Sequence, residues 1–176
     1  MKNKKKTFQI VLAVVSVFLL VLLDQVTKMA AVSNLKGKQA VKLIPGVFEL
    51  QYLENRGAAF GTLQNQRWFF IIIVVLVLAA VVWCFLRIPT GRHYQPLRIT
   101  GVLIAAGAVG NMIDRVVNGY VVDFFYFSLI DFPIFNVADI YVTVSMALLF
   151  ILILTLYREE DFGFLKPDGR KNRDRV

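Results

Sequence analysis

The stretch WFFIIIVVLVLAAVVWCFL, at residues 68–86, decides the fold, because it runs for 19 residues without a charge. A helix needs about 20 mostly apolar residues to cross the roughly 30 Å hydrocarbon core of a bilayer. The rest of the chain is also apolar: 57% of its 176 residues are hydrophobic, and its mean hydropathy is +0.63. A soluble domain of this size carries less apolar sequence. The sequence therefore predicts a membrane protein.

Three further segments have the character of membrane spans. Residues 8–23 are largely apolar and follow four lysines, so a cleaved secretory signal is the alternative interpretation, with small residues at 31–33 as a loose cleavage site. Asp24 and Lys28 would lie between that run and that site, so we favour an uncleaved span. Residues 97–115 are rich in glycine and alanine, which allow helices to approach closely. The predicted spans are residues 8–32, 68–86, 97–115 and 137–156.

The distribution of basic residues predicts the orientation of these spans. The segment before the first span, the connection between the second and third, and the tail together carry 13 lysines and arginines, against seven on the other side. Lysine and arginine accumulate on the cytoplasmic side of membrane proteins. We therefore expect both termini, including a charged tail at residues 166–176, to be cytoplasmic. The net charge of +8 fits anionic lipid headgroups, and no nucleic-acid-binding pattern accompanies it.

The composition excludes several kinds of active site. Cys84 is the only cysteine and His93 the only histidine, and they lie in different segments. An internal disulfide and a cysteine-ligated zinc site are therefore impossible. A Ser/His/Asp triad or a Cys/His dyad is also disfavoured, because the solitary histidine lies in a polar loop. We expect neither a metal nor a cofactor.

Two aspartates, Asp123 and Asp139, stand in apolar sequence at expected membrane edges. A carboxylate near lipid is unfavourable by roughly 2.5–3.5 kcal/mol on insertion scales, so it is kept where it has a role. If the two converge, their repulsion holds a proton on one of them. A carboxylate beside a carboxylic acid can activate water against a peptide bond. The bland alternatives are a turn residue at Asp123 and a helix-dipole partner at Asp139.

Other polar residues crowd the same, outer ends of the spans. Asp24 and Lys28 are four residues apart and share a helix face, either as a mutually neutralising pair or as a brace for a nearby site. Asn111 is a candidate donor to a substrate backbone. Arg115 either holds a neighbouring carboxylate or lipid phosphate, or is a snorkelling cap. Asp114 lies beside it.

The outer connection at residues 34–61 has the pattern of a small sheet. Residues 48–52 alternate apolar and polar side chains, as in a strand with one apolar face. Asn55 and Gly57 mark a turn, and the small side chains of Gly57, Ala58 and Ala59 leave room for another backbone. The aromatic residues at 120–135 are expected at the level of the lipid headgroups.

Five motifs occur in an order that resembles the lipoprotein signal peptidase, or signal peptidase II, family. They are DQVTK at 24–28, NRGAAF at 55–60, GNMIDR at 110–115, VDF at 122–124 and FNVAD at 135–139. The resemblance implies an all-α membrane protein with four transmembrane helices and a small extracytoplasmic β-sheet, in one domain over residues 1–165. It implies a bacterial inner-membrane aspartic endopeptidase that cuts diacylglyceryl-modified prolipoproteins before the lipidated cysteine of the lipobox.

By motif position, the resemblance makes Asp123 and Asp139 the catalytic pair and leaves open which one is protonated. Asn55, Gly57, Asn111, Arg115 and Asn136 would orient substrate and aspartates, with structural support from Asp24, Lys28 and Asp114. We expect a monomer whose partners are its prolipoprotein substrates and membrane lipids. The rival classes are a small transporter or proton channel, which would place polar residues near midplane, and a purely structural scaffold.

Overall fold

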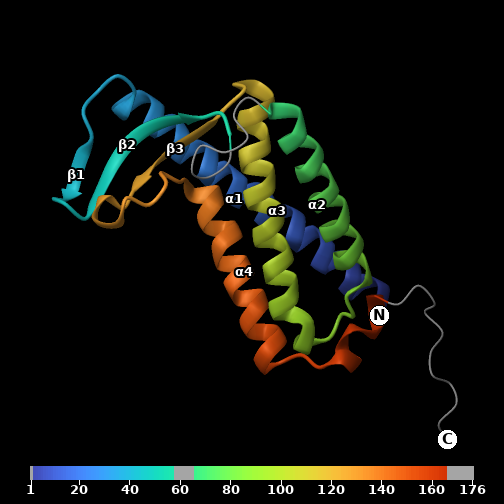
Figure 1. Cartoon of the computed structure of the whole chain (residues 1–176). Helices are drawn as coiled ribbons and strands as arrows, with labels where there is room; N and C mark the ends of the chain where they lie inside the picture. The colour runs from blue at the N-terminus through green and yellow to red at the C-terminus, as the bar shows by residue number, and fades with distance from the viewer. Residues whose placement is uncertain (1, 58–65, 166–176) are drawn as a thin grey trace, which may run out of the picture.

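The computed structural model describes residues 2–57 and 66–165 and consists of four long helices with a three-stranded sheet at one end of the bundle (Figure 1). The long helices are α1 (Lys2–Leu35), α2 (Arg67–Arg87), α3 (Gln95–Val117) and α4 (Val137–Thr155). The strands are β1 (Val41–Ile44), β2 (Phe48–Asn55) and β3 (Val121–Tyr126), and η2 (Arg92–Tyr94), η3 (Ser128–Ile130) and η4 (Glu159–Leu165) are short 3-10 helices.

Within the described residues, four helices are long and apolar enough to cross a membrane. No residue of α2 is fully buried against the described part of the chain: one face is half-buried and packs on α3, and the other leaves its apolar side chains exposed for lipid. Helix α3 contacts the other three and lies between α2 and α4 in Figure 1. Helix α1 is longer than the span predicted at 8–32, since the helix continues through the lysines before it and on to Leu35.

Two glycines allow α3 to pack closely against α4 and α1. A Cβ atom at Gly107 would lie 2.5 Å from the carbonyl oxygen of Ala138, and one at Gly110 would lie 2.5 Å from Oδ2 of Asp24. Real Cβ atoms do not approach so closely, so any side chain at these positions would displace a neighbour. The small residues of α3 thus bring the polar ends of α1, α3 and α4 together.

The sheet has the order β1-β2-β3 with antiparallel pairing throughout. The predicted strand at 48–52 is present and continues to Asn55. The apolar face of the sheet packs on the C-terminal end of α1, where Ala31 and Leu35 form a buried cluster with Val122 and Phe124 of β3. In Figure 1 the sheet lies at the opposite end of the bundle from the N-terminus and η4.

Strand β3 was not predicted by the sequence analysis, which gave for residues 120–135 only a position at the level of the lipid headgroups. Its pairing with β2 joins residues about 70 positions apart, for instance Leu53 with Asp123, and a local sequence pattern does not show such a partner. The small residues Ala58 and Ala59 and the charged tail at 166–176 lie outside the described residues.

Candidate active site

Asp123 is buried on β3, with 1% of its surface exposed. Both of its carboxyl oxygens accept hydrogen bonds from side-chain amides: Oδ2 from Nδ2 of Asn55 at 2.8 Å, and Oδ1 from Nδ2 of Asn136 at 2.6 Å. The first donor comes from the end of the neighbouring strand and the second from the residue before α4. Asp123 is therefore a strand residue whose carboxyl group is fixed by two hydrogen bonds, and not a turn residue.

Asp139 lies in the first turn of α4, where it forms a capping box with Asn136. Its backbone N–H donates to Oδ1 of Asn136 at 3.0 Å, and its Oδ2 accepts from the backbone N–H of Asn136 at 3.1 Å. The other carboxyl oxygen, Oδ1, accepts from Nδ2 of Asn111 on α3 at 2.8 Å. The cap and Asn111 together fix the direction of this carboxyl group.

Asn136 connects the two aspartates, because its side chain donates to Asp123 and its backbone donates to Asp139. It is fully buried. The preceding residue, Phe135, is hydrogen-bonded to β3 through the backbone of Phe124 and Phe125, at distances of 2.8–3.0 Å. This bridge holds the start of α4 against the strand that carries Asp123.

A buried ion cluster lies behind this pair. Nζ of Lys28 is 2.9 Å from Asp24 and 3.0 Å from Asp114, and it donates to Oδ1 of Asn111 at 2.9 Å. Asp24 also accepts from the backbone N–H of Ala138 at 3.0 Å. The predicted pair of Asp24 and Lys28 is thus part of a larger cluster that links α1 to α3 and to the start of α4.

Asn55 and Gly57 form the expected turn, in which Oδ1 of Asn55 accepts from the backbone N–H of Gly57 at 3.0 Å. Arg115 donates to the carbonyl oxygens of Gly57 and Asn111, each at 3.4 Å, and its guanidinium lies 4.7 Å from the ring centre of Phe70. Among the described residues, Arg115 forms no ion pair within 4.0 Å. It therefore binds backbone carbonyl oxygens and not the neighbouring carboxylate that the sequence analysis gave as one possible partner.

The pKa of Asp123 is raised above the usual value of an aspartate, first by burial and second by the negative charge of Asp139. Together they raise the pKa of Asp123 to about 7, although the hydrogen bonds from Asn55 and Asn136 act in the opposite direction. A carboxyl group with such a pKa carries a proton over much of the neutral range. The site can therefore present an acid and a carboxylate together.

Gln25 is a polar residue of this site that sequence reasoning did not single out. Its Nε2 donates to Asp24, to Asp114 and to the carbonyl oxygen of Gly110, at 3.1–3.2 Å. A glutamine inside an apolar span was the available signal. Within residues 2–57 and 66–165, no group of three or more His, Cys, Asp or Glu side chains could hold a metal ion.

The comparison with protein families decides the identity. The model of the family described as signal peptidase (SPase) II matches residues 16–155. The chain belongs to the signal peptidase II family. Members of this family are aspartic peptidases, and the chain has lipoprotein signal peptidase activity, the removal of signal peptides from prolipoproteins.

Relatives with this name cover nearly the whole chain. The lipoprotein signal peptidase of Streptococcus thermophilus (strain CNRZ 1066) is 47% identical over 150 residues, which are 84% of this chain and 93% of the relative. That of Symbiobacterium thermophilum is 47% identical over 152 residues, with 85% and 96% covered. That of Streptococcus pyogenes serotype M5 is 42% identical over 160 residues, with 91% and 99% covered.

Solved structures agree with the fold of signal peptidase II found here. A bacterial membrane enzyme determined in meso at 2.3 Å resolution superposes with a TM-score of 0.74 at 33% identity, covering 90% of this chain and 94% of that one. A second, at 1.9 Å resolution, gives a TM-score of 0.72 at 34% identity, covering 81% and 92%. The chain is therefore a multi-pass bacterial membrane enzyme.

Proposed function

We propose that Asp123 and Asp139 are the catalytic pair of this signal peptidase II, with Asp123 as the protonated partner and Asp139 as the carboxylate. The observation that carries the proposal is Asn136, which donates to one oxygen of each aspartate and so holds both carboxyl groups at one place. The raised pKa of Asp123, about 7, supports its role as the acid. The N-terminus of α4 and two N–H donors stabilise negative charge at Asp139.

The reaction follows from these two states. Asp139 takes a proton from a water molecule as the water oxygen bonds to the scissile carbonyl carbon, while Asp123 gives its proton to the carbonyl oxygen. The carbon–nitrogen bond of the resulting diol then breaks, as Asp139 returns a proton to the leaving nitrogen and Asp123 recovers its own. Two protons are transferred and returned, and one water is consumed. Asn55, Asn111 and Asn136 hold the two carboxyl groups in place for these transfers.

The substrate on this proposal is a prolipoprotein with diacylglycerol on its lipobox cysteine, cut just before that cysteine. The pair lies at the sheet end of the bundle, while the helices present exposed apolar side chains along their length. Acyl chains can therefore stay in lipid beside the helices while the peptide reaches the pair. At the edge of the site, Arg115 donates a hydrogen bond to the backbone carbonyl oxygen of Gly57.

The orientation proposed for the chain puts both termini in the cytoplasm and the pair near the extracytoplasmic surface of the membrane. The basic segments at the N-terminus and around η2, and Arg158 just before η4, lie at the end of the bundle away from the sheet (Figure 1). The lysines and arginines of these segments support its cytoplasmic placement, because basic residues accumulate on that side of membrane proteins. We also propose that the enzyme acts as a monomer, since the described chain supplies every side chain used above.

The test is cleavage of a diacylglyceryl-modified lipobox peptide in detergent by wild type, Asp123→Asn and Asp139→Asn. Asp131→Asn is the matched control, because Asp131 is an exposed turn aspartate at the same end of the molecule, with a positive φ that asparagine tolerates. We expect both active-site variants to lose activity by at least about 10³-fold and the control to retain it. Folded Asp123→Asn or Asp139→Asn protein that still cuts at the wild-type rate would refute the assignment.

A further inference from the structure

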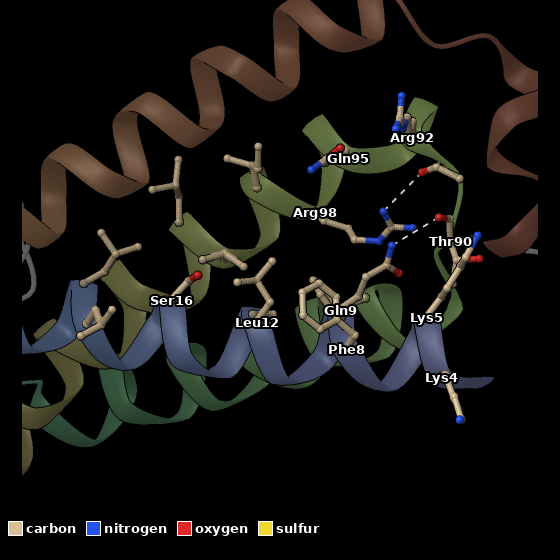
Figure 2. Close-up of a pocket in the computed structure, with 18 residues that line it drawn as sticks. Lys4, Lys5, Phe8, Gln9, Leu12, Ser16, Thr90, Arg92, Gln95 and Arg98 are labelled. Atoms are coloured by element: carbon tan, nitrogen blue, oxygen red, sulfur yellow. Dashed lines mark hydrogen bonds between the residues drawn. The ribbon is translucent and has the colours of Figure 1, made fainter. Parts of the chain in front are cut away.

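A cavity of about 780 Å³ lies at the end of the bundle away from the aspartate pair, between α1 and α3 (Figure 2). On α1 its lining runs from Lys4 to Leu20 along one helix face, with Phe8, Leu12 and Ser16 at intervals of four residues. Sixteen residues of helix correspond to about 24 Å. That length exceeds one leaflet, which is half of the roughly 30 Å hydrocarbon core. The cavity is therefore a long apolar trough open at the helix surface.

One end of this trough is polar and positively charged. Lys4, Lys5, Arg92 and Arg98 line it, and no aspartate or glutamate is among its lining residues in the described part of the chain. Lys4, Lys5 and Arg92 take part in none of the ion pairs found among the described residues. Figure 2 shows Lys5 and Arg92 at this end, next to the loop that precedes α3.

The loop that closes the polar end is held in place by side chains of the cavity itself. Arg98, which is 7% exposed, donates to the carbonyl oxygens of Pro89 and, at 3.4 Å, Gly91. Gln9 donates to the carbonyl oxygen of Thr90 at 3.3 Å. Helix α3 begins just after this loop, and its N-terminus adds partial positive charge. The positive end is thus built from the start of α1, the loop and the start of α3.

We propose that this trough binds one anionic phospholipid, with its headgroup phosphate at Lys5, Arg92 and the start of α3 and one acyl chain between α1 and α3. The volume lies within the range of about 300–1,000 Å³ that holds small ligands. Charge complementarity favours a negative headgroup, because four basic residues line this end, next to a helix N-terminus, and none of the described residues that line the trough is acidic. In the orientation proposed above, the lipid comes from the cytoplasmic leaflet; binding itself does not depend on that orientation.

The charge also argues against the hydrophobic segment of the substrate's signal peptide as the occupant. A signal peptide begins with a positively charged region before its apolar segment. If the apolar segment filled the trough, that region would lie against the lysines and arginines of the polar end. A lipid with a negative headgroup meets the opposite charge and fills the same apolar walls.

The test uses the full chain, purified in detergent and stripped of lipid, with native mass spectrometry at equal concentrations of dioleoylphosphatidylglycerol and dioleoylphosphatidylcholine. We expect one phosphatidylglycerol to bind at least about tenfold more tightly than phosphatidylcholine. The double variant Lys5→Gln/Arg92→Gln should weaken phosphatidylglycerol binding by about tenfold or more, since each basic residue near an anionic headgroup contributes appreciably. The control, Lys38→Gln/Lys42→Gln, removes the same charge from exposed residues near the sheet and should bind as wild type does.

A second variant tests the apolar part separately. Ala13 lines the trough on α1, so Ala13→Phe should lower phosphatidylglycerol retention while every headgroup contact remains. Lipobox cleavage by these variants shows that they are folded, since none of the changed residues lies at the aspartate pair. Equal retention of the two lipids by wild type, or equal losses in the Lys5/Arg92 and Lys38/Lys42 variants, would overturn the proposal. One-for-one displacement of the lipid by a hydrophobic leader peptide would assign the trough to the substrate instead.

Discussion

Nζ of Lys28 lies 2.9 Å from Oδ1 of Asn111, and this contact decides which way the amide of Asn111 points. An ammonium group only donates hydrogen bonds, so it must face the amide oxygen. The amide nitrogen is thereby directed to Asp139, which it reaches at 2.8 Å. A buried cation on α1 thus orients a donor on α3 toward a carboxyl group on α4.

The donor itself should matter for rate. We expect Asn111→Ala to lower kcat by about 10²–10³-fold, the range seen when one preorganised donor is removed from an active site. Asn118→Ala, an exposed position just beyond the end of the same helix, should cleave as wild type does. A kcat for Asn111→Ala within threefold of the Asn118→Ala value would contradict the role of Asn111.

The cation should matter for stability. Lys28→Met leaves Asp24 and Asp114 buried without their common partner, a change of about 3–5 kcal/mol. For a chain of this size that corresponds to a melting temperature lower by on the order of 10 °C. Lys36→Met removes a half-exposed pair with Glu54 and should shift the melting temperature by only a few degrees. Similar melting temperatures for the two variants in detergent would show that the buried cluster is not stabilising.

The activity should fall on the alkaline side of neutrality. Asp123 must carry a proton in the proposed reaction, and its pKa is raised to about 7 by burial first and by the charge of Asp139 second. Below that pH the proton is present; above it Asp123 ionises and the rate declines tenfold per pH unit. The measurement is kcat/KM for the lipobox peptide from pH 5 to 9. A rate that stays level up to pH 9 would exclude Asp123 as the acid.

Asn136→Ser separates helix capping from the chemistry. Serine caps helices about as well as asparagine, so α4 should begin at the same residue. The variant lacks the amide that donates to Asp123 at 2.6 Å, and we expect kcat to fall by about 10²-fold. Because this hydrogen bond lowers the pKa of Asp123, its loss should move the alkaline limb of the pH profile to higher pH. A limb that moves to lower pH would contradict the assignment.

The closeness of α3 and α4 can be tested at Gly107. Gly107→Ala places a methyl group 2.5 Å from the carbonyl oxygen of Ala138, next to Asp139, and backbone atoms must move to make room. We expect a loss of about 1–3 kcal/mol and a clear drop in cleavage. Gly101→Ala is the matched control on the same helix, because its methyl group meets Phe85 and Val81 at an ordinary 3.8 Å. Equal melting temperatures and rates for both variants would mean that the contact at Gly107 is not tight.

Part of this structure follows from local sequence. Residues 68–86 must form a helix in lipid, since no other backbone satisfies its own hydrogen bonds there. Asp123 and Asp139 stand out because a carboxylate in apolar sequence is unfavourable. The strand at 48–52 is visible in its alternation, which a two-residue period explains. These features depend on neighbours along the chain.

Only the tertiary structure decided how these residues meet. The sequence alone predicted that Asp123 and Asp139 lie at the same membrane face, but it left open which would be the acid. Our proposal that Asp123 is the acid rests on its burial by β2, β3 and the start of α4. The pairing of β3 with β2, the three contacts of Gln25 and the turn of Arg115 toward carbonyl oxygens join segments far apart in the chain. Such contacts depend on which strands and helices pack together, and neither the periodicity nor the composition of the sequence determines which surfaces meet.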